Sequence, residues 1–253
     1  MAPTLTLFFV VEPPSYQYLA CYLAGSIRQH LGPEVELVGY CPAHRLHEVD
    51  RATVETLRRM RCDLRPMVTE GVFDPAYPHG NKIIACQQPR DTDWGGFMDS
   101  DILVMRPHDV GRLLVPGHVT CSPAASIQWK PEGLWETIYG AFDMPVPKER
   151  IMLMRDRRRP VVPYFSSGFV LFPQTHRTAA GLSFADTWME TAQRIDQIES
   201  LARFKRPYLD QMTLPLSIAR AGLAWNELQE DDHCILGGRL RGRPFPKNRP
   251  ITA

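Results

Sequence analysis

The chain has 253 residues, of which 44% are hydrophobic, and its formal net charge at pH 7 is +1. This composition is typical of a globular protein with a sizeable core, and the charge gives no support for a nucleic-acid partner. The six cysteines include no Cys-Xaa-Xaa-Cys pair. The sequence therefore favours reduced thiols over a disulfide framework or a zinc site.

The apolar run from Leu5 to Val11 is the first candidate for a regular element. It follows no basic leader and is too short for a signal peptide or a membrane span. We therefore interpret it as a strand and expect a cytoplasmic protein with no transmembrane segment. A peripheral association with a membrane stays open.

Apolar runs typical of strands alternate with segments of helical periodicity in the part of the chain that leads to Asp99. The expected strands are Leu5–Val11, Glu34–Cys41, Cys62–Pro66 and the run that ends at Met98. The expected helices are one capped by Ser15, one over His44–Met60 with Leu46, Val49, Val54 and Leu57 buried, and a short one over Asn81–Gln88. This order predicts a Rossmann-like, mostly parallel sheet flanked by helices, which binds ligands beyond the carboxyl ends of its strands.

The second half of the chain is less regular. Its expected strands are Val119–Ser122, the run through Phe172 that begins near Tyr164, and Ala224–Leu228. Its expected helices are Leu134–Phe142, a long one from Leu182 to Ile195, and one that opens at Leu209 and runs to Ala221. No repeat or interdomain linker separates these elements, so we expect one domain over residues 1–253.

Two segments are rich in arginine and are expected to lie outside the regular elements. We expect a mobile basic insertion over residues 145–163, either a solvated loop or a flap beside an anionic ligand. The second segment, Arg239 to Arg249, precedes a chain end at Ala253 that resembles the start of a strand. The sequence therefore leaves open whether the C-terminus is truncated.

Two carboxylates, Asp99 and Asp101, stand one residue apart between apolar runs, the second of which, Ile102–Met105, is expected to be extended. Ionised carboxylates so close together repel each other and lose hydration at a strand end, and a divalent cation would remove both penalties. Oxygen ligands suit Mn²⁺ or Mg²⁺, which are often shared with substrate phosphates. The pattern thus indicates a metal site, with a solvated turn as the alternative.

Three further signals accompany these aspartates in a definite order. They are Asn81-Lys82-Ile83 before the acidic strand end, Ser166-Ser167-Gly168 before an apolar strand, and Asp210-Gln211 at an expected helix start. Together with Asp99-Ser100-Asp101, this order resembles the metal-dependent nucleotide-sugar glycosyltransferases of the A-type fold, especially the glycogenin and bacterial lipopolysaccharide galactosyltransferase type. The resemblance spans about Leu5 to Leu228.

The resemblance implies a function and a set of site residues. The function is transfer of a sugar from a nucleoside-diphosphate sugar, with a UDP-sugar favoured, to an unknown acceptor, with a manganese (or magnesium) ion and with retention at the anomeric carbon. Asp99, Asp101 and His233 are the implied metal ligands, and Asp210 and Gln211 lie beside the reacting centre. The implied donor-binding residues are Val10, Val11, Glu12, Lys82, Asp99, Ser100, Ser166, Ser167 and Gly168.

Several of these residues have alternative roles. Lys82 could pair with a donor phosphate or with Asp99, and Glu12 could bond a ribose hydroxyl or face solvent. Asp210 could cap a helix, or it could deprotonate the acceptor hydroxyl in an inverting enzyme, so the stereochemistry stays open. His233 matches the family only loosely and could be a surface residue. Ser166 stands where the family more often has asparagine.

Two other functions stay open at this stage. One is a phosphohydrolase of the haloacid-dehalogenase type with Asp99 as nucleophile and Asp101 as general acid, although that type places the motif on its first strand. The other is a protein that binds sugar nucleotides without catalysis.

Overall fold

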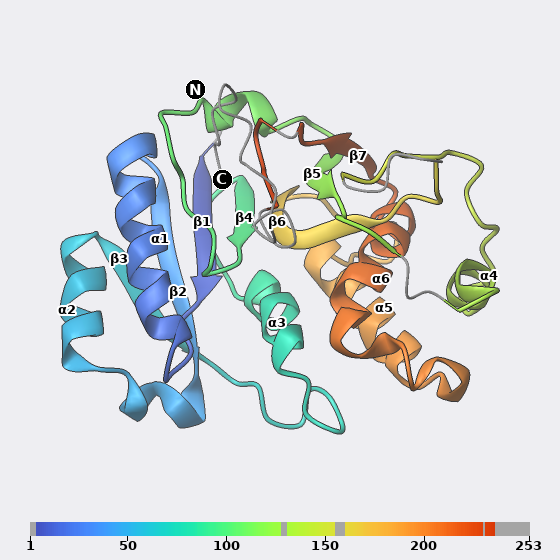
Figure 1. Cartoon of the computed structure of the whole chain (residues 1–253), viewed down its shortest axis with the longest axis horizontal. Helices are drawn as coiled ribbons and strands as arrows, with labels where there is room; N and C mark the ends of the chain where they lie inside the picture. The colour runs from blue at the N-terminus through green and yellow to red at the C-terminus, as the bar shows by residue number, and fades with distance from the viewer. Residues whose placement is uncertain (1–3, 128–130, 155–159, 230, 236–253) are drawn as a thin grey trace, which may run out of the picture.

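The computed structural model describes residues 4–127, 131–154, 160–229 and 231–235. Its described strands form one sheet in the order β3-β2-β1-β4-β6-β5-β7, which Figure 1 shows at the centre of the molecule. The strands are β1 (Leu5–Val10), β2 (Glu36–Pro42), β3 (Cys62–Met67), β4 (Trp94–Met98), β5 (His118–Pro123), β6 (Phe165–Pro173) and β7 (Ala224–Glu227). The expected mostly parallel α/β sheet is confirmed.

The strand β6 is the exception to the parallel arrangement. It pairs antiparallel with β4 on one side and with β5 on the other, whereas β1 pairs parallel with β2 and β4, and β5 pairs parallel with β7. The start of β6 therefore lies at the same sheet edge as the end of β4. This reversal brings two segments far apart in the sequence to one place.

Helices cover both faces of the sheet (Figure 1). They are α1 (Tyr16–Leu31), α2 (Arg51–Arg59), α3 (Asn81–Gln87), α4 (Leu134–Gly140), α5 (Phe184–Asp196) and α6 (Lys205–Arg220). In β1, Leu7 and Phe9 pack with the α1 side chains on one face, while Phe8 packs with α3, α5 and α6 on the other. Successive strand residues point to opposite faces, so this alternation builds two cores around one sheet.

Gly96 allows β1, β4 and β6 to pack closely at the centre of the sheet. A Cβ at this position would lie 2.5 Å from a Leu7 methyl and 2.6 Å from a Leu171 methyl. These distances are shorter than any ordinary carbon contact, so a larger residue would separate the neighbouring side chains. The missing side chain thus helps to hold β4, and the aspartates after it, in position.

Two expectations for local structure were wrong. The segment expected as one helix over His44–Met60 is a 3-10 helix, Ala43–Glu48, followed by α2, and Val54 is exposed instead of buried. The two helices are separated because Val49 and Asp50 have extended backbone angles. The segment Ile102–Met105, expected to be extended, forms no strand and follows a turn at Asp101.

One further expectation needs correction, and the mobility of the basic insertion stays a prediction. The helix α6 begins at Lys205 and kinks at Arg206, so Asp210 lies inside it and does not cap its start. In the basic insertion, Ile151 and Val161 exchange backbone hydrogen bonds of 2.9 Å, and Leu153 is buried, so this part packs against the core. Residues 155–159 and the basic tail fall outside the described residues, as does the chain end at Ala253.

In the described ranges, no helix is both long enough and apolar enough to cross a membrane.

Candidate active site

The site is built where β4 ends and β6 begins. The backbone N–H of Asp99 donates to the carbonyl of Gly168 at 2.7 Å, which continues the antiparallel pairing one residue beyond β4. A turn follows, in which the backbone N–H of Ile102 donates to the carbonyl of Asp99 and the Ser100 hydroxyl donates to the carbonyl of Val10. These contacts tie the Asp99-Ser100-Asp101 turn to both neighbouring strands.

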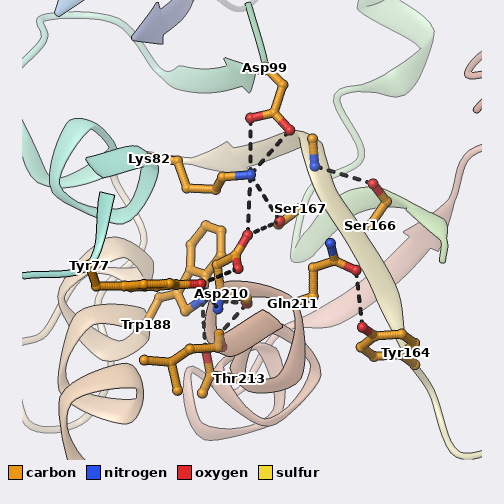
Figure 2. Close-up of polar contacts among 12 residues, drawn as sticks. Tyr77, Lys82, Asp99, Tyr164, Ser166, Ser167, Trp188, Asp210, Gln211 and Thr213 are labelled. Carbon is orange, nitrogen blue, oxygen red and sulfur yellow. Dashed lines mark hydrogen bonds and ion pairs between the residues drawn. The ribbon is translucent and has the colours of Figure 1, made fainter. Parts of the chain in front are cut away.

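Lys82 lies at the centre of a buried network of charges (Figure 2). Its Nζ is 3.0 Å from Asp99 Oδ1, 3.2 Å from Asp210 Oδ2 and 3.2 Å from Ser167 Oγ. Burial by itself lowers the pKa of Lys82, but the two carboxylates outweigh this effect and raise that pKa above its usual value. Lys82 is therefore a permanent cation that neutralises part of the acidic cluster.

Asp210 accepts hydrogen bonds on both carboxylate oxygens. Tyr77 donates its hydroxyl to Oδ1 at 2.7 Å, and Ser167 donates its hydroxyl to Oδ2, the oxygen that also faces Lys82. The indole N–H of Trp188 donates to the Asp210 carbonyl at 3.3 Å. Asp210 is only 2% exposed, so this carboxylate is an anchor inside the protein and has little access to solvent.

Gln211 follows Asp210 in α6 and points away from the helix in a different direction. Its Oε1 accepts a hydrogen bond of 3.1 Å from the hydroxyl of Tyr164, the residue immediately before β6. Figure 2 shows the Gln211 amide nitrogen pointing away from Tyr164, on the side where Ser166 and Asp99 lie. Adjacent residues of α6 thus meet two different parts of the site.

A cavity of about 500 Å³ opens beside these residues. Its lining includes eight of the residues that the sequence predicts for the site, namely Val10, Glu12, Lys82, Asp99, Ser100, Asp101, Asp210 and Gln211. The other lining residues are Pro13, Pro14, Ser15, Tyr16, Pro78, His79, Asn81, Phe97 and Tyr208. This volume is in the range of small-molecule sites.

Glu12 is held at the end of β1 by two neighbours. Arg45 NH1 lies 3.0 Å from its Oε1, and the Asn81 amide donates to its Oε2 at 3.2 Å. Of the two roles considered for Glu12, a purely solvated one does not fit, because the carboxylate is paired and lines the cavity. It can still accept a hydrogen bond from a ligand hydroxyl with its remaining lone pairs.

Five predicted site residues are absent from the cavity lining. The Val11 side chain is buried in the core on the α1 face, and Ser167 lies behind the cavity between Lys82 and Asp210. Ser166, whose hydroxyl accepts from the Gly168 N–H at 3.3 Å, and Gly168, whose carbonyl accepts from the Asp99 N–H, lie at the start of β6. The fifth, His233, is considered with the metal site.

The side chains of Asp99 and Asp101 suit a divalent cation by their chemistry. They are two carboxylates of one turn, both facing the cavity, and the loss of hydration at Asp99 raises its pKa. A Cβ on Gly168 would lie 2.9 Å from Asp99 Oδ2, so the glycine leaves room for that carboxylate. This donor set fits Mn²⁺ or Mg²⁺.

The structure does not assemble the predicted ligand set of Asp99, Asp101 and His233. Over the described ranges, no three His, Cys, Asp or Glu side chains are grouped to hold an ion. His233 is 5% exposed, not a surface residue; its ring packs against Phe169, and burial lowers its pKa to about 4. It is neutral at pH 7 with Nδ1 unpartnered, the state a metal ligand needs, so its role as third ligand stays a prediction.

Three contributors to the site were missed from the sequence. Tyr77 and Tyr164 hold Asp210 and Gln211, and Arg45 holds Glu12. A signal existed for Tyr164, which directly precedes Phe165 and the Ser166-Ser167-Gly168 motif at the start of β6. No local pattern marks Tyr77 or Arg45, because their partners are distant in the sequence.

Comparison with known proteins decides the family. Residues 7–222 match the Rhodobacterales glycosyltransferase domain. The chain belongs to this glycosyltransferase family. Membership decides against the phosphohydrolase alternative and agrees with the resemblance on which the site was predicted.

The fold of this glycosyltransferase is also similar to solved structures. It matches the galactosyltransferase LgtC in complex with donor and acceptor sugar analogues, with a TM-score of 0.53 and 14% identity over 98% of this chain and 85% of that chain. An active-site mutant of LgtC matches with the same TM-score and coverage and 12% identity. These matches confirm the A-type glycosyltransferase fold. No curated protein is detectably similar in sequence.

Proposed function

We propose that this glycosyltransferase uses a nucleoside-diphosphate sugar, with a UDP-sugar favoured, and transfers the sugar to an acceptor hydroxyl with retention at the anomeric carbon. The observation that carries the proposal is the convergence of Asp99, Asp101 and Gln211 on one cavity at the carboxyl end of the sheet. LgtC, which has the same fold, was solved with donor and acceptor sugar analogues. That likeness supports a sugar donor and acceptor here.

Asp99 and Asp101 would hold a manganese or magnesium ion in this proposal. When bound, such an ion stabilises the negative charge of a departing diphosphate as a Lewis acid. Lys82 offsets part of the negative charge of the acidic cluster and stays buried beside Asp99. Glu12, which lines the same cavity, would accept a hydrogen bond from the nucleoside.

The contacts of Asp210 support retention. An inverting enzyme needs a base that takes the proton of the acceptor hydroxyl. Asp210 already accepts hydrogen bonds from Tyr77 and Ser167 and faces Lys82, so both of its carboxylate oxygens have partners inside the protein. Gln211, which lines the cavity next to Asp210, is a neutral amide and cannot act as a base.

Release of free nucleoside diphosphate from a panel of nucleotide sugars tests the proposal. Hydrolysis to water gives a readout without a known acceptor, and each donor is assayed with manganese and with a chelator. We expect release of nucleoside diphosphate from one donor, and the release should be strongest with manganese. In NMR, the first anomer of the transferred or hydrolysed sugar to form should have the same configuration as the donor. Inversion would contradict retention. Tight manganese-dependent binding of UDP without any turnover would favour the non-catalytic alternative.

Two variants separate metal binding from sugar contact. Asp101→Ala should remove manganese-dependent UDP binding in calorimetry, because it removes a metal ligand. Gln211→Ala should leave that binding nearly intact and lower kcat, which is expected of a contact made mainly in the transition state. The exposed Asp91→Ala, in the loop before β4, is the matched control and should behave as the wild type.

A further inference from the structure

The amide of Gln211 has two chemically different ends, and one of them accepts a hydrogen bond within the protein. The carbonyl oxygen Oε1 accepts the hydroxyl of Tyr164 at 3.1 Å. The other end, the NH₂ group, can only donate hydrogen bonds. Figure 2 shows this nitrogen on the side of the site where Asp99 and Ser166 lie.

Tyr164 is itself held in place from several directions. It is 1% exposed, its ring lies against that of Trp135 at 5.8 Å between centroids, and its carbonyl accepts the backbone N–H of Ala124 at 2.9 Å. Burial raises the pKa of Tyr164, so its hydroxyl keeps its proton and can donate it to Gln211. A hydroxyl on so confined a ring has few alternative positions, and the amide that it holds is confined as well.

We propose that Tyr164 is a positioning residue that holds the carbonyl of Gln211, so that Gln211 presents its NH₂ group to the donor sugar as a hydrogen-bond donor. This inference rests on the proposed function. It states which end of the Gln211 amide faces the donor sugar. A donating NH₂ group can stabilise negative charge on an oxygen of the sugar or of the leaving group. A carbonyl turned toward the same place could not, and it would instead stabilise a positive centre.

A double-mutant cycle tests the positioning role. Tyr164→Phe removes only the hydroxyl, and we expect kcat to fall roughly tenfold with the donor KM within about twofold, because one oriented hydrogen bond is lost. In a Gln211→Ala background the same substitution should change kcat by less than about twofold, because Tyr164 then has no amide to hold. The buried Tyr139→Phe, in α4, is the control and should not change kcat in either background.

Equal losses of kcat from Tyr164→Phe in both backgrounds would show a general structural role and overturn the proposal. The orientation has its own test in Gln211→Glu, which keeps the shape of the side chain and replaces NH₂ by a second oxygen. We expect kcat to fall at least as far as in Gln211→Ala. A kcat equal to or above that of the wild type would overturn the donor orientation.

Failure of the proposed function would look different from failure of this inference. A wild-type chain that releases no nucleoside diphosphate from any sugar nucleotide overturns the proposed function, and the inference with it. A wild-type chain with turnover and equal losses in both backgrounds overturns the inference alone.

Discussion

The Nζ atom of Lys82 lies 3.0 Å from Asp99 Oδ1. The lysine makes this contact inside the protein, because only 8% of its surface is exposed. A buried ammonium is tolerated only where opposite charge surrounds it. The second carboxylate, that of Asp210, completes that environment. The network therefore links stability and function in the same side chains.

Replacing Lys82 by Met should lower the free energy of unfolding by about 3 kcal/mol, because two carboxylates then lose their counter-charge. Adding Asp210→Asn to Lys82→Met should restore part of the loss, since one of the unbalanced charges is gone. Urea denaturation of the two variants and the wild type measures both effects. A double variant less stable than Lys82→Met would contradict this account.

Tyr77→Phe should lower the free energy of unfolding by about 2 kcal/mol, because the 2.7 Å hydrogen bond to the Asp210 carboxylate is lost in a buried place. Chemical denaturation followed by fluorescence is a suitable measurement. Tyr22→Phe, on the exposed face of α1, serves as the control and should change stability by a few tenths of a kcal/mol at most. Equal effects of the two substitutions would argue against an anchoring role for Tyr77.

Gly168→Ala should weaken manganese-dependent binding of UDP about tenfold while the fold survives. The added Cβ would lie 2.9 Å from Asp99 Oδ2 and would push this carboxylate away from its position. Calorimetry with UDP measures the change. At Gly140 an added Cβ meets no atom within 4 Å, so Gly140→Ala should bind UDP as the wild type does. Unchanged affinity in Gly168→Ala would show that the glycine does not position Asp99.

His233 should make the chain less stable in acid. Burial lowers the pKa of His233 to about 4 from its ordinary value of 6.5, so between these values the unfolded chain takes up a proton that the folded chain does not. The resulting stability is complete above pH 6.5 and is lost as the pH falls toward 4, with a total of about 3 kcal/mol. His233→Phe should therefore flatten the pH dependence of the unfolding free energy in this window. Parallel curves for variant and wild type would contradict the burial of a neutral imidazole.

Much of the fold could be predicted because apolar periodicity is a local property of the sequence. The strand that ends at Met98 and the helix α3 lie close to where that pattern indicates. The expected helix over His44–Met60 was wrong for a reason outside the segment. The backbone N–H of Asp50 donates to Gln17 Oε1 of α1 at 2.8 Å, and this tertiary contact accompanies the break.

The site was predictable only where its residues form short motifs. Asp99 and Asp101 stand together in one motif. Lys82 and Gln211 were identified because the order of the motifs along the chain resembles that of the glycosyltransferase family. Tyr77 could not be found in this way, because its partner Asp210 is 133 positions away in the chain. Its contact exists only after α6 packs beside the loop that leads to α3.

The reversed direction of β6 has a practical consequence for work on the enzyme. The junction between Asp99 and Gly168 is a main-chain hydrogen bond, so its formation does not depend on which side chains the two positions carry. Variants that slow turnover at Gln211 should consequently keep the pairing of the two strands. Such slow but folded proteins, which keep the metal ligands, are suited to trapping an intact donor for crystallography, and they offer a direct route to the identity of the sugar.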